Sequence, residues 1–193
     1  MIRLSIFILL YGCAGSPEGT PACKQAGEKQ QAVQPQYCDT VLAGDLDNNQ
    51  LQDTIFILTP PTLVALDEQG RIEYELDCVD GNCYNNLLFS CDLPDLFVDK
   101  SVWGRVENAG DLNGDGISEL LFVPGWFSGS ATHLCLYSLK KDKWIKVAAV
   151  SHRRNDDEPL LTSKLLKKNN RYYLCGVLFD GHDTPYEMQV ELD

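Results

Sequence analysis

The sequence predicts an all-β protein, and three features of the chain support this fold class. Most segments after residue 40 are rich in Val, Ile, Leu, Tyr and Phe and alternate partly with a period of two, as in "DTIFILT" and "YEMQVELD". Polar turns such as Asp-Glu-Gln-Gly and Lys-Lys-Asn-Asn separate these segments. The third feature is an internal repeat, described below. The one helix that we expect is a short one near residues 93–98.

The N-terminus has the features of an export signal. In "MIRLSIFILLYGC" a single cation, Arg3, precedes an apolar run that is too short for a membrane-spanning helix, which takes about 20 residues. The run has the length of a signal-peptide core. Its end, Leu10-Tyr11-Gly12-Cys13, resembles the lipobox of bacterial lipoproteins. An ordinary secretory signal and a buried N-terminal strand are the alternatives.

The lipobox resemblance implies that residues 1–12 are removed and that Cys13 is lipidated. The protein would then be held on a membrane of the cell envelope. Ala14 follows the cysteine where some lipoproteins carry an acidic retention signal, which favours the outer membrane, on its periplasmic or surface side.

The next segment and the rest of the chain differ in composition. Residues 13–36 are rich in Ala, Gly, Gln, Pro and Glu and poor in large apolar residues, which predicts a flexible tether. Residues 37–193 remain, a length that suits a single domain with its own hydrophobic core. We therefore expect one all-β domain on a tether.

The charge of the chain argues against nucleic acid as a partner. Sixteen basic and 28 acidic residues give a net charge of -12. Binding to phosphate backbones requires clustered Lys and Arg, and the sequence has no such cluster outside one stretch that reads as a hairpin.

Eight cysteines in an exported chain indicate disulfide bonds. The Asp-Gly-Asn turn between Cys78 and Cys83 would let these two sulfurs meet across a tight loop. Cys135 and Cys175 lie inside apolar runs, where they could equally be buried free thiols. The pairing of the other cysteines stays open.

The repeat appears when Gly44 is aligned on Gly110, an offset of 66 residues. The alignment places Asp45 on Asp111, Asp53 on Glu119 and an apolar strand after each loop. Residues 163–193 supply a partial third unit without the loop. Units of this length suit β-propeller blades, but propellers typically use four to eight of them. We therefore expect blade-like antiparallel sheets that cannot form a full propeller, unless a homo-oligomer completes the ring.

The loop of each repeat carries oxygen ligands at alternate positions, the pattern that suits Ca²⁺. Gly116 gives the second loop a residue that tolerates a positive φ at the bend, whereas the first loop has Gln50 there. The alternative is an Asx-rich turn in which the side chains bind their own backbone amides without a metal. The candidate ligands are Asp111, Asn113, Asp115, the Ile117 carbonyl and Glu119 in the second loop, and Asp45, Asp47, Asn49, Leu51 and Asp53 in the first.

These loops resemble the FG-GAP repeat of integrin-type β-propellers and the related VCBS repeats. An EF-hand is disfavoured, because its twelfth loop position needs Glu and here holds Phe122, and because a strand follows the loop. The resemblance covers two windows of about 15 residues and the strand pattern after each. It implies that calcium stiffens the blades and that ligand binding occurs elsewhere.

The sequence contains no recognisable catalytic motif. Trp126 and Phe127 lie in a Gly- and Ser-rich loop, where they could contact a sugar or a peptide or cover the core. The predicted function is a calcium-stabilised binding or scaffolding module on the cell envelope, with a protein or glycan ligand. The alternative is an envelope hydrolase or carbohydrate-active protein on the same frame, which would use His182 with Asp180 or Asp183.

Overall fold

The computed structural model describes residues 30–127, 129–154 and 160–192. The predicted signal peptide, the predicted lipidation site at Cys13 and most of the predicted tether lie outside these residues. The strands are β1 (Gln31–Gln34), β2 (Cys38–Gly44), β3 (Asp53–Leu58), β4 (Thr62–Leu66), β5 (Ile72–Cys78), β6 (Tyr84–Phe89), β7 (Leu96–Asp99), β8 (Trp103–Gly110), β9 (Glu119–Gly125), β10 (Ala131–Lys140), β11 (Lys143–Arg153), β12 (Leu165–Lys168), β13 (Arg171–Leu178) and β14 (Thr184–Val190). Two short 3-10 helices, η1 (Val79–Gly81) and η2 (Leu161–Lys164), complete the described part. The all-β fold class is confirmed.

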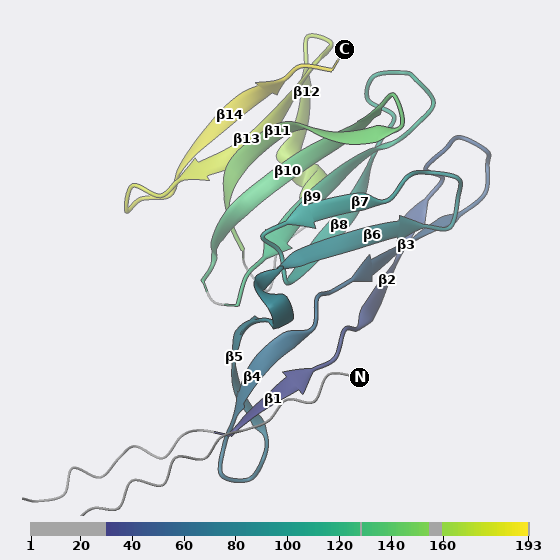
Figure 1. The fold of residues 1–193 in the computed structure, drawn as a ribbon. Helices are drawn as coiled ribbons and strands as arrows, with labels where there is room; N and C mark the ends of the chain where they lie inside the picture. Colours follow the sequence, from purple (N-terminus) through teal and green to yellow (C-terminus); the bar gives the residue numbers. More distant parts are fainter. Residues whose placement is uncertain (1–29, 128, 155–159, 193) are drawn as a thin grey trace, which may run out of the picture.

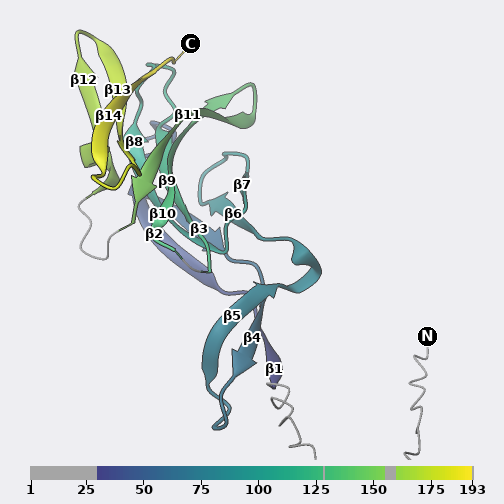
Figure 2. The ribbon, with the colours of Figure 1, turned by 90° about the vertical axis from the view of Figure 1, so that its left-hand side faces the viewer.

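The strands form four antiparallel sheets, three of which stack face to face (Figure 1). The first sheet has the order β2-β3-β6-β7, the second β11-β10-β9-β8 and the third β12-β13-β14. The fourth, β1-β4-β5, projects away from the stack (Figure 2). Within the described ranges, no helix has the length and apolar character needed to cross a membrane.

The two four-stranded sheets share one plan, as the blade-like interpretation predicts. In each sheet the first strand ends in an irregularity just before a glycine, and that glycine pairs with the acidic residue that opens the next strand. The pairs are Gly44 with Asp53 and Gly110 with Glu119. The first sheet differs because the β4–β5 hairpin is inserted between its second and third strands.

The hydrophobic core lies between the stacked sheets and is centred on β9. Successive side chains of a strand point to opposite faces of its sheet. Leu120 and Phe122 therefore pack against the first sheet, whereas Leu121 and Val123 pack against the third. This double burial explains why β9 is an uninterrupted apolar run. Gly104 on β8 is required beside it, because a Cβ there would lie 2.1 Å from the Phe122 ring.

Two sequence expectations differ from the structure. Residues 31–34, assigned to the tether, form β1 and pair with β4. The helix expected near residues 93–98 is absent, and Leu96–Asp99 forms β7 instead. The reason is that Leu96 and Val98 alternate with Phe97 and point into the core while β7 pairs with β6. The expected third unit is present as β12-β13-β14.

Candidate metal loops and ligand pocket

The two repeat loops have the same backbone conformation. Each connects the first and second strands of its sheet, and each has positive φ at two equivalent positions. These are Asn48 (φ 59) and Gln50 (φ 68) in the first loop, and Gly114 (φ 82) and Gly116 (φ 90) in the second. The chain therefore curls in the same way in both loops, although only the second has glycine at these bends.

In the second loop, the candidate ligands accept hydrogen bonds from the amides of the loop itself. The Asp111 carboxylate accepts from the N–H groups of Gly114 (2.7 Å) and Gly116 (3.0 Å), and Asp115 accepts from Ile117 (2.9 Å). Asn113 accepts from the Asp115 amide (2.9 Å). This is the arrangement expected of an Asx-rich turn. It leaves room for a cation, because each carboxylate oxygen can accept more than one partner.

The first loop brings its carboxylates closest together. One oxygen from each of Asp45, Asp47 and Asp53 lies within 4.8 Å of the others. Asn49 is hydrogen bonded within the same loop, to Asp47 through its side chain (3.0 Å) and to the Leu51 amide through its oxygen (2.7 Å). Carboxylate oxygens at this spacing are suited to a hard divalent cation such as Ca²⁺.

A buried carboxylate, here called the closing acid, follows each loop and accepts a hydrogen bond from a backbone amide of that loop. Asp53 accepts from the Leu46 amide (2.8 Å), and Glu119 accepts in the same way from the Leu112 amide (2.7 Å). The second oxygen of each group accepts from a serine hydroxyl, Ser90 (3.2 Å) in the first sheet and Ser138 (2.9 Å) in the second. The two serines do not occupy equivalent positions of the repeat. Phe89 pairs with Ile55 and Leu136 pairs with Leu121, so the residue equivalent to Ser138 is Cys91.

Electrostatics set Glu119 apart from ordinary surface acids. Burial raises the pKa of Glu119, and the nearby Asp115 and Asp111 raise it further, against hydrogen bonds from Leu112 and Ser138 that lower it. Beside the first loop, burial and the Asp53 carboxylate raise the pKa of the Cys91 thiol to about 12. Cys91 is therefore a neutral thiol next to the loop.

The two loops also touch across the sheet boundary. Ser118, just before β9, donates its amide to the Leu46 carbonyl (2.8 Å), and Asn108 on β8 donates to the Ala43 carbonyl (2.8 Å). The Leu46 side chain is buried in the core between the first two sheets. A change that stiffens one loop would therefore also restrict the motion of the other.

A pocket of about 850 Å³ lies between the first and second sheets. Its walls are the end of β7, the loop after β9, and one face of β10 and β11. His133, Cys135 and Tyr137 alternate along β10 and so share that face. The lining residues are Phe97, Val98, Asp99, Lys100, Pro124, Gly125, Trp126, Ala131, Thr132, His133, Cys135, Tyr137, Trp144, Lys146 and Ala149.

A β-bulge in β11 decides which of its residues face the pocket. The pairing of β10 with β11 shifts between Leu136 and Tyr137, which leaves Val147 as the extra residue. Val147 and Ala148 therefore both pack toward the third sheet. Lys146 and Ala149, three positions apart, consequently line the same pocket.

The two aromatic residues expected to contact a ligand, Trp126 and Phe127, lie in different surroundings. Trp126 lines the pocket and is 44% exposed. Phe127 meets it edge-on, with ring centroids 5.2 Å apart, and packs against the small buried cluster that contains Cys78 and Cys83.

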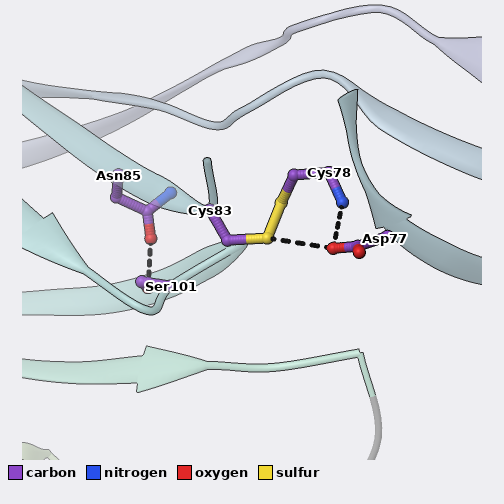
Figure 3. The surroundings of a disulfide bond; sticks show 5 residues. All are labelled: Asp77, Cys78, Cys83, Asn85 and Ser101. Atoms are coloured by element: carbon purple, nitrogen blue, oxygen red, sulfur yellow. Dashed lines mark hydrogen bonds between the residues drawn. A yellow bond between two sulfur atoms is a disulfide. The ribbon is translucent and has the colours of Figure 1, made fainter. Parts of the chain in front are cut away.

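That cluster includes the predicted Cys78–Cys83 disulfide, which is present (Figure 3). Asp77 accepts a hydrogen bond from the Cys78 amide (2.8 Å), and the Ser101 hydroxyl donates to Asn85 close by. Cys135 and Cys175 are free thiols, one of the two outcomes expected for them.

The histidines do not gather into one site. His133 lines the pocket, whereas His152 is buried in β11. The turn around His182 is occupied by internal contacts: Asp180 accepts from the His182 amide (3.0 Å) and the Thr184 hydroxyl (2.7 Å), and Asp183 pairs with Arg153 (2.7 Å). These contacts give the hydrolase alternative no support.

Comparison with protein-family models, curated protein sequences and solved structures gives no match for this chain.

Proposed function

We propose that this chain is a lipid-anchored protein of the cell envelope that acts as a binding module on an FG-GAP-like frame stiffened by calcium. The observation that carries the binding role is the pocket between the first two sheets. Its volume of about 850 Å³ lies in the range of small-molecule sites. Aromatic rings and a few polar side chains line it, the usual composition of such sites.

The calcium frame is supported by the geometry of the loops. Three carboxylates of the first loop converge, and the second loop repeats its backbone conformation and its buried closing acid. A cation at either loop would tie together the first two strands of a sheet. Because the loops touch through Ser118 and Leu46, the ion would also fix the two sheets that form the pocket.

Thermal unfolding of the full chain, purified in detergent, tests the calcium frame. We expect the melting temperature to rise when calcium replaces a chelator. Asp45→Ala and Asp111→Ala should each reduce this rise, whereas Glu68→Ala, a change at an exposed acid in the β4–β5 turn, should leave it unchanged. If calcium does not alter any of the melting curves, the calcium frame is wrong.

The binding role is tested by screening the same protein on an array of envelope glycans and peptides. We expect a ligand whose signal is lost in Trp126→Ala, since that ring is exposed at the pocket. Binding that survives this change would place the ligand elsewhere. Labelling of cells with a fatty acid, lost in Cys13→Ser, tests the anchor.

A further inference from the structure

We propose that the pocket binds a saccharide that carries carboxylate groups, such as an oligosaccharide of uronic acids. This inference rests on the proposed binding function and names the chemistry of its ligand. It is carried by three observations: the charge of the lining, the backbone that places this charge, and the arrangement of the aromatic rings.

The charge of the pocket lining is opposite in sign to the net charge of the chain. The protein has a net charge of -12, yet two lysines, Lys100 and Lys146, line this pocket with His133, against a single acid, Asp99. An acidic protein repels anions over most of its surface. A local excess of cations in a concave site therefore selects for an anionic ligand, because field lines are focused there.

Both lysines are placed by irregular backbone. Lys146 faces the pocket because of the bulge at Val147. Lys100 follows β7 with a φ of 54, in the left-handed region where Gly or Asn would cost less. Strain of this kind, on the order of 1 kcal/mol or more, persists where the surrounding structure enforces it and is concentrated at binding sites.

The aromatic rings suit a sugar. Trp126 and Phe97 are exposed at the pocket (44% and 62%), so their ring faces are accessible to a ligand. Trp144 donates its indole N–H to the Pro94 carbonyl (2.7 Å), which fixes the ring where it lines the pocket. Flat apolar faces with nearby polar groups match the two-sided character of a sugar, whose C–H face is apolar and whose edge is polar.

An acidic peptide fits these features less well. A peptide that binds by strand addition needs a run of unpaired main-chain groups along a sheet edge. Two edge strands border this pocket. β7 has only four residues and is ended by the left-handed conformation of Lys100, and β11 is interrupted by the bulge at Val147. The aromatic rings also come from four separate elements, β7, β10, β11 and the loop after β9, so they form a cup instead of a continuous edge.

Isothermal titration calorimetry of the full chain in detergent, with calcium present, tests the proposal. The probes are trimers of galacturonate, glucuronate and mannuronate, their uncharged methyl esters, and a hexaglutamate peptide. We expect at least one acidic trimer to bind about tenfold more tightly than its ester, and its affinity to fall as salt increases. The peptide should bind no better than the esters.

Matched variants localise the effect. Lys146→Met and Lys100→Asn should each weaken binding of the acidic trimer about three- to tenfold. Lys141→Asn is the control, because Lys141 also has positive φ (48) but lies in the β10–β11 turn outside the lining. It removes the same charge with the same backbone change, so binding should be unaffected. Thermal melts will show whether each variant is folded.

The possible outcomes separate this inference from the proposed function. If an ester or another neutral sugar binds as well as the acid, and Trp126→Ala abolishes binding, the binding module stands and the carboxylate preference is wrong. Tight binding of hexaglutamate without binding of the trimers overturns the saccharide in favour of a peptide. If no probe and no array ligand binds, both proposals fail.

Discussion

Glu119 on β9 accepts a hydrogen bond from the Ser138 hydroxyl on β10 (2.9 Å), and both side chains are almost fully buried. The other carboxylate oxygen accepts from the Leu112 amide in the second loop (2.7 Å). A single side chain thus joins the loop, the strand that follows it and the neighbouring strand. It acts as a brace even before any cation is considered.

Removing this brace should destabilise the protein. Glu119→Ala would leave the Leu112 N–H and the Ser138 hydroxyl without their partner, and an unpartnered buried group costs about 1–3 kcal/mol. We expect the free energy of unfolding to fall by about 3 kcal/mol in urea titrations. Glu119→Gln keeps an acceptor and should lose much less; equal losses in the two variants would show that the hydrogen bonds contribute little.

The raised pKa of Glu119 predicts a pH dependence in calcium-depleted buffer. The folded state binds the proton of this group more tightly than the unfolded state does. Its contribution is therefore fully present below the ordinary pKa and is lost as pH rises through the folded pKa. The stability of the native chain relative to Glu119→Gln should thus fall as pH rises above about 4.5. A difference that stays constant with pH would contradict this expectation.

Substitutions at the bends of the two loops should have opposite effects on the free energy of unfolding. Gln50 has positive φ where the second loop has Gly116. Gln50→Gly relieves the strained conformation but adds freedom to the unfolded chain, so we expect a net gain of about 0.5 kcal/mol. Gly116→Gln should cost about 1 kcal/mol. Urea titrations of both variants measure the difference, and a loss in Gln50→Gly would mean that its side chain has a favourable contact.

Gly104 should tolerate no side chain. A Cβ at this position would lie 2.1 Å from the Phe122 ring, in the core between the first two sheets. We expect Gly104→Ala to lower the free energy of unfolding by about 1–3 kcal/mol. The matched test is the same change in a Phe122→Leu background, where the cost should be smaller because the ring is gone. Equal costs in both backgrounds would exclude the ring as the cause.

The Cys78–Cys83 disulfide closes a short loop, so its expected contribution is modest. Chain-entropy estimates for a loop of this size give about 2 kcal/mol. The double variant Cys78→Ala/Cys83→Ala should lose about this amount in urea titrations. Cys38→Ser, at an exposed free thiol, is the control and should change little. A double variant as stable as the native chain would show that the surrounding packing suffices.

The sequence predicted the fold well where local patterns and burial agree. The two-residue alternation, the polar turns and the 66-residue repeat anticipated the strands and the matched sheets. The loop conformation followed from the spacing of Asp111, Asp115 and Gly116. The prediction of a helix near residue 96 was wrong because a window of six residues cannot show that Leu96 and Val98 would pair into a sheet.

The pocket could not be predicted, because it depends on contacts distant in sequence. The alternation of His133, Cys135 and Tyr137 marks one face of a strand but does not show what faces it. Lys146 joins that face only because the pairing shifts beside Val147, and bulges of this kind leave no local sequence signal here. Lys100 reaches the pocket because its strand lies at the edge of a different sheet.

The extra residue in β11 decides how this strand responds to changes of chain length. Deleting Val147 would remove the bulge and join Lys146 directly to Ala148, so the residues on both sides would keep their facing and their pairing with β10. Deleting Ile145 would instead either turn Trp144 away from the Pro94 carbonyl or, with the bulge lost, turn Lys146 out of the pocket and Val147 into it. Loss of the Val147 codon should therefore be tolerated better than loss of its neighbours, and a gene library scanned for single-codon losses would show a local maximum of tolerance there.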